Sequence, residues 1–224
     1  MKKLILSAAI ILSAALSVSA QSWFVNVAGG ASIYGGEHNR QLKTTKLITY
    51  AGDLSVGKWF NPYIAARVSF SDFNAKGATW ESYIKQDANG KPIHVNEINA
   101  LKKNYDSMAQ FLFAQQFNAM NLHADIMVNL SNLFGSSDKV DQHTWNASPY
   151  VGLGFPYVLS SNGKSAGLPL AVNAGLYNAF PVSEKIDIIA DLRGVLLDEE
   201  FDGESGDSKL EGYSSLTIGV SFKF

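Results

Sequence analysis

Residues 215–224 read SLTIGVSFKF, and this stretch decides the fold class. Its apolar residues occupy every second position: Leu216, Ile218, Val220, Phe222 and Phe224. A period of two places these side chains on one face of a β-strand and the small or polar residues between them on the other. The chain therefore ends in a strand with one apolar and one polar face.

The same alternation recurs in seven earlier segments. It is clearest at 64–71, 120–130 and 186–196, and weaker at 23–34, 50–58, 149–157 and 170–180. Most of the segments are about ten residues long, which is the length that a tilted strand needs to cross a bilayer. The sequence thus predicts eight strands.

The polar faces of these segments are rich in Gly, Ala, Ser and Asn, with isolated Asp and Arg. A water-facing surface would carry more Lys, Glu and Thr, whereas small residues and sparse charges suit the narrow interior of a small barrel. We therefore predict an all-β fold: an eight-stranded antiparallel transmembrane up-and-down β-barrel. A soluble barrel that binds a ligand shares the alternation and differs in which face meets water.

The connections between the segments support this orientation. Long connections at 35–46, 76–115, 159–168 and 199–210 are expected on the outer side, and tight turns at 60–62 and 181–184 on the periplasmic side. The connection at 131–145 is expected on the periplasmic side and is unusually long. Aromatic residues near the strand ends are expected to form the girdles at the two membrane surfaces: Trp23, Trp59, Tyr63, Tyr157, Phe180, Phe222 and Phe224.

The second outward loop, 76–115, carries apolar residues at three- and four-residue spacing, which predicts a short amphipathic helix. These residues are Val95, Ile98, Leu101, Tyr105, Met108 and Leu112. The apolar stripe could cap the barrel, lie on the membrane or meet a partner.

Residues 1–20 have the layout of a cleaved signal peptide. Lys2 and Lys3 precede an apolar stretch, and Val18-Ser19-Ala20 supplies the small residues of a cleavage site. The expected mature chain is 21–224. The formal net charge of −2 gives no sign of a nucleic-acid partner, and the absence of cysteine excludes disulfides and thiolate metal sites.

The segment MNLHADIMVNLSNLF at 120–134, followed by PYVGLGF at 149–155, resembles the barrel half of outer membrane protein A-like proteins, especially those of Bacteroidetes-type bacteria. The resemblance implies residence in the Gram-negative outer membrane and contact with its lipid. The end of the chain, Leu216 to Phe224, resembles the signal that the outer-membrane assembly machinery reads, and Leu216, Ile218, Val220, Phe222 and Phe224 would carry it. The family's C-terminal peptidoglycan-binding domain is not expected here.

The alternation predicts a group of charged residues in the lumen: Asp53, Arg67, His123, Asp125, Asp187, Asp191, Arg193 and Lys223. Buried charges need partners, so these residues should form ion pairs that fill the interior. A narrow ion path lined by the same charges is the alternative. The acidic loop at 198–207 could bind calcium weakly, although a solvated loop is the simpler interpretation.

No catalytic motif accompanies these patterns. A Gly-x-Ser-x-Gly elbow and paired-histidine metal spacing are both missing from the sequence. We therefore expect a non-catalytic outer-membrane barrel without cofactor or metal, with a structural role and a possible surface ligand at its outward loops. The alternatives are a narrow ion or small-solute channel, a lipid-modifying enzyme and the soluble ligand-binding barrel.

Overall fold

The computed structural model describes residues 23–35, 44–80, 88–89, 97–105, 110–135, 143–159, 170–198 and 210–224. The predicted signal peptide lies outside these residues. Their strands and helices, in chain order, are β1 (Trp23–Gly35), α2 (Thr44–Leu47), β2 (Ile48–Trp59), β3 (Ile64–Trp80), β4 (Glu97–Tyr105), β5 (Gln110–Val128), α3 (Leu130–Gly135), β6 (Asn146–Leu159), β7 (Ala171–Pro181), β8 (Ile186–Asp198) and β9 (Leu210–Lys223).

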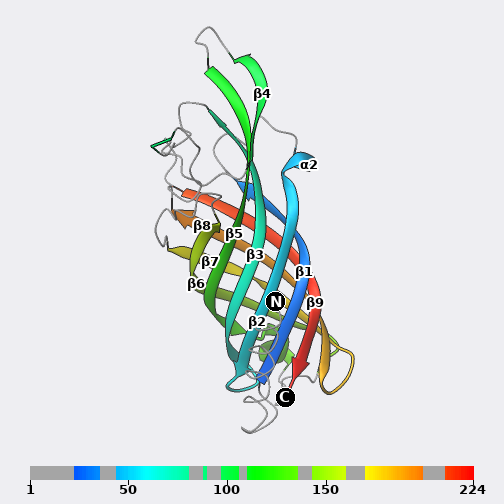
Figure 1. The fold of residues 1–224 in the computed structure, drawn as a ribbon. Coiled ribbons are helices and arrows are strands. Elements are labelled where there is room, and N and C mark those ends of the chain that lie inside the picture. The colour runs from blue at the N-terminus through cyan, green and yellow to red at the C-terminus, as the bar shows by residue number, and fades with distance from the viewer. Residues whose placement is uncertain are drawn as a thin grey trace, which may run out of the picture.

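Eight of these strands close into an antiparallel barrel. Neighbouring strands pair in the order β3-β2-β1-β9-β8-β7-β6-β5, and an additional pairing of β3 with β5 closes the ring. That closing pairing runs from Ile64 opposite Val128 to Trp80 opposite Leu112. The predicted eight-stranded barrel is therefore confirmed, and β4 is a ninth strand outside the ring that pairs only with β5. Figure 1 shows β4 and the adjoining part of β5 standing beyond one end of the barrel.

The two faces of the barrel wall have opposite chemistry. Apolar side chains on the outer face are exposed, among them Val68 at 55%, Ile126 at 62% and Ile218 at 62%. Charged side chains on the inner face are buried, as Arg67 and Asp125 are at 2% each. A soluble barrel has the reverse arrangement, because its interior must be apolar and its surface meets water. The distribution therefore fits a wall that faces lipid.

The height of the apolar band also fits a membrane. On β8 the outward positions from Ile186 to Leu196 are occupied by apolar residues and glycine. Ten residues of strand at about 3.3 Å each, tilted by about 40°, rise roughly 25 Å. That height matches the apolar band of outer-membrane barrels. No helix among the described residues is long and apolar enough to cross a bilayer.

The helix predicted within 76–115 is wrong for the described part of that loop. Strand β3 continues to Trp80, β4 occupies Glu97–Tyr105, and β5 begins at Gln110. Val95 and Met108 lie outside the described residues. The three- and four-residue spacing of apolar residues gave a wrong prediction because hydrogen bonding between neighbouring strands can override a weak helical pattern.

The opposite end of the barrel carries the two shortest connections between strands of the ring. Two tight turns join β2 to β3 and β7 to β8, and the longer connection between β5 and β6 contains α3. Short connections mark the periplasmic side of such barrels. We therefore refer to this as the periplasmic end and to the opposite one as the loop end.

Candidate functional site

The candidate site is the barrel lumen, because all eight charged residues predicted to face it do so. Successive side chains of a strand point to opposite faces. On β8, Asp187, Asp191 and Arg193 are buried while the alternate Ile188 and Leu192 are exposed. The structure divides the eight residues into a central group of six and a separate pair.

Arg67 on β3 lies at the middle of the central group. Its Nε and Nη2 atoms donate to Oδ2 of Asp125 at 3.0 and 2.8 Å, and its Nη1 atom donates to Oδ2 of Asp191 at 2.8 Å. The guanidinium also lies 4.4 Å from the ring centroid of Tyr150. One arginine thus connects β3 to β5, which is its neighbour, and to β8, which lies across the lumen.

Arg193 forms a second centre. It donates to Asp53 at 2.9 Å, to Asp191 at 3.3 Å and to the Tyr150 hydroxyl at 3.1 Å, and it also contacts the Ser71 hydroxyl. Tyr150 in turn donates to Oδ1 of Asp191 at 2.7 Å. Charged hydrogen bonds of this kind are stronger than neutral ones in a dry interior. The two arginines and three aspartates therefore form one continuous network.

His123 joins the network in an arrangement that resembles a hydrolase triad. Its Nδ1 atom lies 2.8 Å from Asp125, and its Nε2 atom lies 3.2 Å from the Ser71 hydroxyl. Ser71, however, donates its single proton to Asp53 at 2.9 Å. A nucleophilic serine must give that proton to the histidine. The geometry therefore gives Ser71 a hydrogen-bonding role within the network.

Two members of this network were missed by sequence reasoning, Ser71 and Tyr150. The alternation at 149–157 contained the signal for Tyr150, because it places this tyrosine on the face opposite Val151 and Leu153. Ser71 stood among many inward serines, and nothing in the sequence distinguished it from Ser69.

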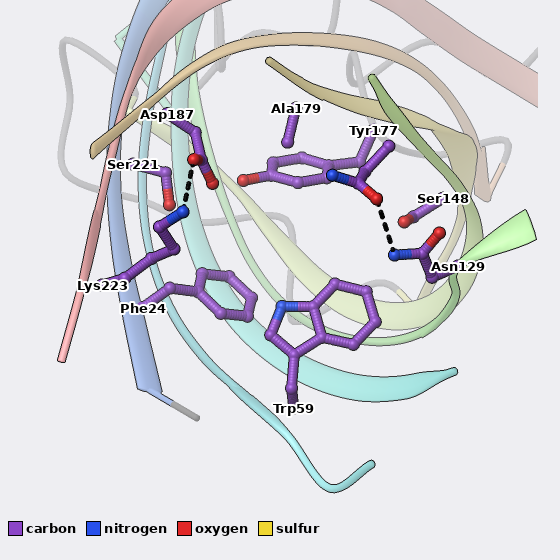
Figure 2. Close-up of a pocket in the computed structure, with 10 residues that line it drawn as sticks. Phe24, Trp59, Asn129, Ser148, Tyr177, Ala179, Asp187, Ser221 and Lys223 are labelled. Carbon is purple, nitrogen blue, oxygen red and sulfur yellow. Dashed lines mark hydrogen bonds and ion pairs between the residues drawn. The ribbon is translucent and has the colours of Figure 1, made fainter. Parts of the chain in front are cut away.

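The remaining pair, Lys223 and Asp187, lies near the periplasmic end, where Lys223 Nζ is 2.6 Å from Asp187 Oδ1. Figure 2 shows the pair beside a small pocket into which Trp59 and Tyr177 also project. The predicted placement of Trp59 in an interfacial girdle is wrong. Trp59 is on the inward-facing side of β2 and packs against Phe24, with ring centroids 6.3 Å apart.

Apolar clusters lie on both sides of the charged network. Toward the loop end, the rings of Phe73 and Tyr213 stack with centroids 3.9 Å apart, and Tyr34 meets Phe117 edge-on at 5.5 Å. Toward the periplasmic end a second cluster is formed by Phe24, Ala65, Met127, Tyr150, Tyr177, Ala179 and Ile189. The interior is thus filled in layers along the barrel axis, as expected for eight strands.

The small residues of the lumen make room for the large ones. A Cβ atom added to Gly57 would lie 2.2 Å from the Phe24 ring, and one added to Gly175 would lie 2.4 Å from the Tyr150 hydroxyl oxygen. These glycines explain why the inner face is rich in small residues. They allow Phe24 and Tyr150 to cross a narrow interior.

The acidic loop at 198–207 is a candidate for weak calcium binding, with a solvated loop as the simpler interpretation. Residues 199–209 of the acidic loop lie outside the described residues. In the part of the chain that the structure describes, no three or more His, Asp or Glu side chains are grouped to hold a metal ion.

Comparison with known proteins finds a relative in sequence and a similar solved structure. Outer membrane protein 40 of Porphyromonas gingivalis is 27% identical to the chain over 172 residues, an alignment that covers 74% of this chain and 37% of the relative. The crystal structure of Neisserial surface protein A matches with a TM-score of 0.55 at 11% identity, covering 90% of this chain and 97% of that one. The chain is a small outer-membrane β-barrel. The sequence matches no protein-family model.

The relatives bear out the expected location and the resemblance to outer membrane protein A-like barrels. The barrel resides in the outer membrane, and its exposed apolar wall contacts the lipid there. The alignment with this chain spans 37% of the length of the Porphyromonas protein, which is well under half. The likeness to the crystal structure of Neisserial surface protein A, at 11% identity, establishes a shared fold.

Proposed function

We propose that this barrel is a closed, non-catalytic scaffold that contributes to the structure of the outer membrane and presents its outward connections for surface contacts. The layered filling of the lumen carries the proposal. A charged network lies between two apolar clusters, and Arg67, Asp125 and His123 within it are each 2% exposed. A permanent pore needs a continuous aqueous path, which such layers interrupt.

The network supports a structural role because its members are paired with one another. Arg67 bridges two aspartates, and Arg193 bridges Asp53 and Asp191. An ion path requires charges that bind a passing ion weakly and exchange it. Side chains held by several mutual hydrogen bonds are poorly suited to that exchange.

Conductance in planar lipid bilayers tests the closed lumen. We expect no stable conductance steps from the refolded wild-type barrel. An Arg67→Ala variant should also stay silent, because the apolar clusters on either side remain. A Phe73→Ala/Tyr213→Ala double variant removes the stacked pair at the loop end. It tests whether the apolar cluster there helps to block the lumen.

Conductance steps of constant size from the wild type, shifted in size by Asp53→Asn, would overturn the closed scaffold in favour of a narrow channel.

The proposal that the barrel is non-catalytic is tested by lipid analysis. Lipid A and phospholipid compositions of cells with and without the gene should be the same, and a difference that the purified barrel reproduces on vesicles would make it an enzyme.

A further inference from the structure

The periplasmic end of the barrel carries a ring of exposed apolar side chains that the closed scaffold does not explain. We call these residues the periplasmic collar: Phe60 at 64% exposed, Leu133 at 51%, Phe134 at 81%, Trp145 at 51% and Val182 at 62%. They come from all three connections at this end, in β2–β3, β5–β6 and β7–β8. The β5–β6 connection contributes three of the five, and two of these lie on α3.

The orientation of α3 is fixed by its polar residues. Asn129 accepts from the backbone amide of Asn132 at 3.0 Å and so caps the start of the helix. The Asn132 side chain is fully buried and donates to the Pro62 carbonyl at 2.7 Å. The hydroxyl of Ser131 accepts from the Ala147 amide at 3.0 Å. With these positions tied to the barrel, Leu133 and Phe134 are turned away from it.

The collar is continuous with the wall that faces lipid. Ile64, paired with Val128, is 43% exposed on the outer face, and α3 begins two residues after Val128. Trp145 stays on the outer side, where its indole nitrogen donates to Asn178 at 3.1 Å. A tryptophan with a hydrogen-bonded N–H and an exposed ring is typical of the membrane–water interface.

The dimensions place α3 within the interfacial layer. A helix of six residues is about 9 Å long, since each residue adds roughly 1.5 Å. The headgroup layer on each side of a bilayer is about 5–8 Å thick, and interfacial helices bury their apolar face about 5–10 Å into it. Leu133 and Phe134 therefore lie within reach of the boundary between headgroups and acyl chains.

We propose that α3 is an interfacial anchor that inserts Leu133 and Phe134 into the periplasmic leaflet of the outer membrane. The partner is a phospholipid surface. The distribution of the collar favours lipid over a protein, because its residues belong to connections spaced around the barrel and a membrane plane meets all of them together. On the β1–β2 side, Lys58 lies over the Trp23 ring at 5.2 Å and adds a cation near the headgroup phosphates.

The absence of cysteine permits a direct test with single-cysteine variants of the whole barrel. Phe134→Cys and Leu133→Cys would carry an environment-sensitive fluorophore, and Lys46→Cys, exposed on α2 at the loop end and away from the collar, is the control. The barrel is refolded into vesicles of phosphatidylethanolamine and phosphatidylglycerol. A boiling-dependent gel shift verifies that each variant has folded.

We expect the labels on α3 to emit at shorter wavelength than the Lys46 label. A lipid carrying a nitroxide high on its acyl chain should quench them strongly, and aqueous iodide should quench them several-fold less than the control. Equal quenching of all three labels by iodide would overturn the proposal, because α3 would then lie in water. Protection from iodide without quenching by the spin-labelled lipid would also overturn it and assign the collar to a protein partner.

Discussion

At the scale of single residues, Arg67 is the side chain on which the lumenal network depends. It is 2% exposed and neutralises both Asp125 and Asp191. Replacing it with a neutral side chain leaves two carboxylates without their main partner in a dry interior. Removing one member of a buried ion pair costs about 3–5 kcal/mol, whereas an exposed turn residue changes stability by about 0.5 kcal/mol or less.

We therefore expect Arg67→Met to lower the free energy of unfolding by about 3–5 kcal/mol. The measurement is a urea titration of the barrel in lipid vesicles, with Lys185→Met in the exposed turn as the control. Equal stability of the two variants would mean that the network contributes little to the fold and would weaken the scaffold proposal.

Gly57 and Gly52 offer a second comparison within one strand. A Cβ on Gly57 would collide with the buried Phe24 ring, while a Cβ on Gly52 would lie 3.9 Å from its nearest neighbour, the Asp72 carbonyl. We expect Gly57→Ala to destabilise the barrel by about 1–3 kcal/mol through overpacking, and Gly52→Ala to be close to neutral. The same urea titration measures both.

Adding Phe24→Leu to Gly57→Ala should recover part of the loss, because the smaller side chain relieves the collision. If Gly57→Ala behaves like Gly52→Ala, the Phe24 ring is free to move and the periplasmic apolar cluster is looser than its contacts indicate.

At the scale of elements, the arm beyond the barrel is formed by β4 and the part of β5 that pairs with it. This arm should be separable from the ring. Trp80 and Leu112 are direct partners at the far end of the β3–β5 pairing, so a two-residue Asn-Gly loop can join them. We expect a variant with residues 81–111 replaced by Asn-Gly to keep its boiling-dependent gel shift, because all eight strands of the ring remain paired. Loss of that shift would show that the arm is needed to close the barrel.

The cap of α3 is a second test at this scale. Asn129→Ala removes the hydrogen bond to the Asn132 amide and also the bond that Asn129 donates to Asn146 at 3.3 Å. Loss of such a cap costs about 1 kcal/mol. We expect a loss of at least this size in the urea titration, with the exposed turn variant Glu184→Ala unchanged. No loss would mean that the helix end is satisfied in another way.

At the scale of the whole molecule, ring closure dictates the behaviour in detergent. Every strand of the ring has two neighbours, so no backbone edge is left within it. We expect the barrel to need detergent for extraction and to migrate compactly in gels until it is boiled. Recovery in the soluble fraction without a gel shift would contradict the membrane assignment at the level of the isolated protein.

The number of strands in the closed ring, their inward and outward faces and the identity of the lumenal charges could be read from the sequence. Alternation is a local property, because successive side chains of a strand point to opposite faces wherever the strand lies. The inward orientation of Arg67, Asp125 and Arg193 followed from it. The role of Phe222 and Phe224 in assembly stays a prediction.

Only the tertiary structure decided which charges meet. Arg67 contacts Asp191 across the lumen, 124 positions along the chain, and this distance depends on how the ring closes. Trp59 shares the inward face of Asp53 by the same alternation, whereas pairing with β5 is what made part of the second outward loop into β4. Alternation along a strand is fixed by local backbone geometry, whereas contacts across a barrel depend on the register of every strand between them.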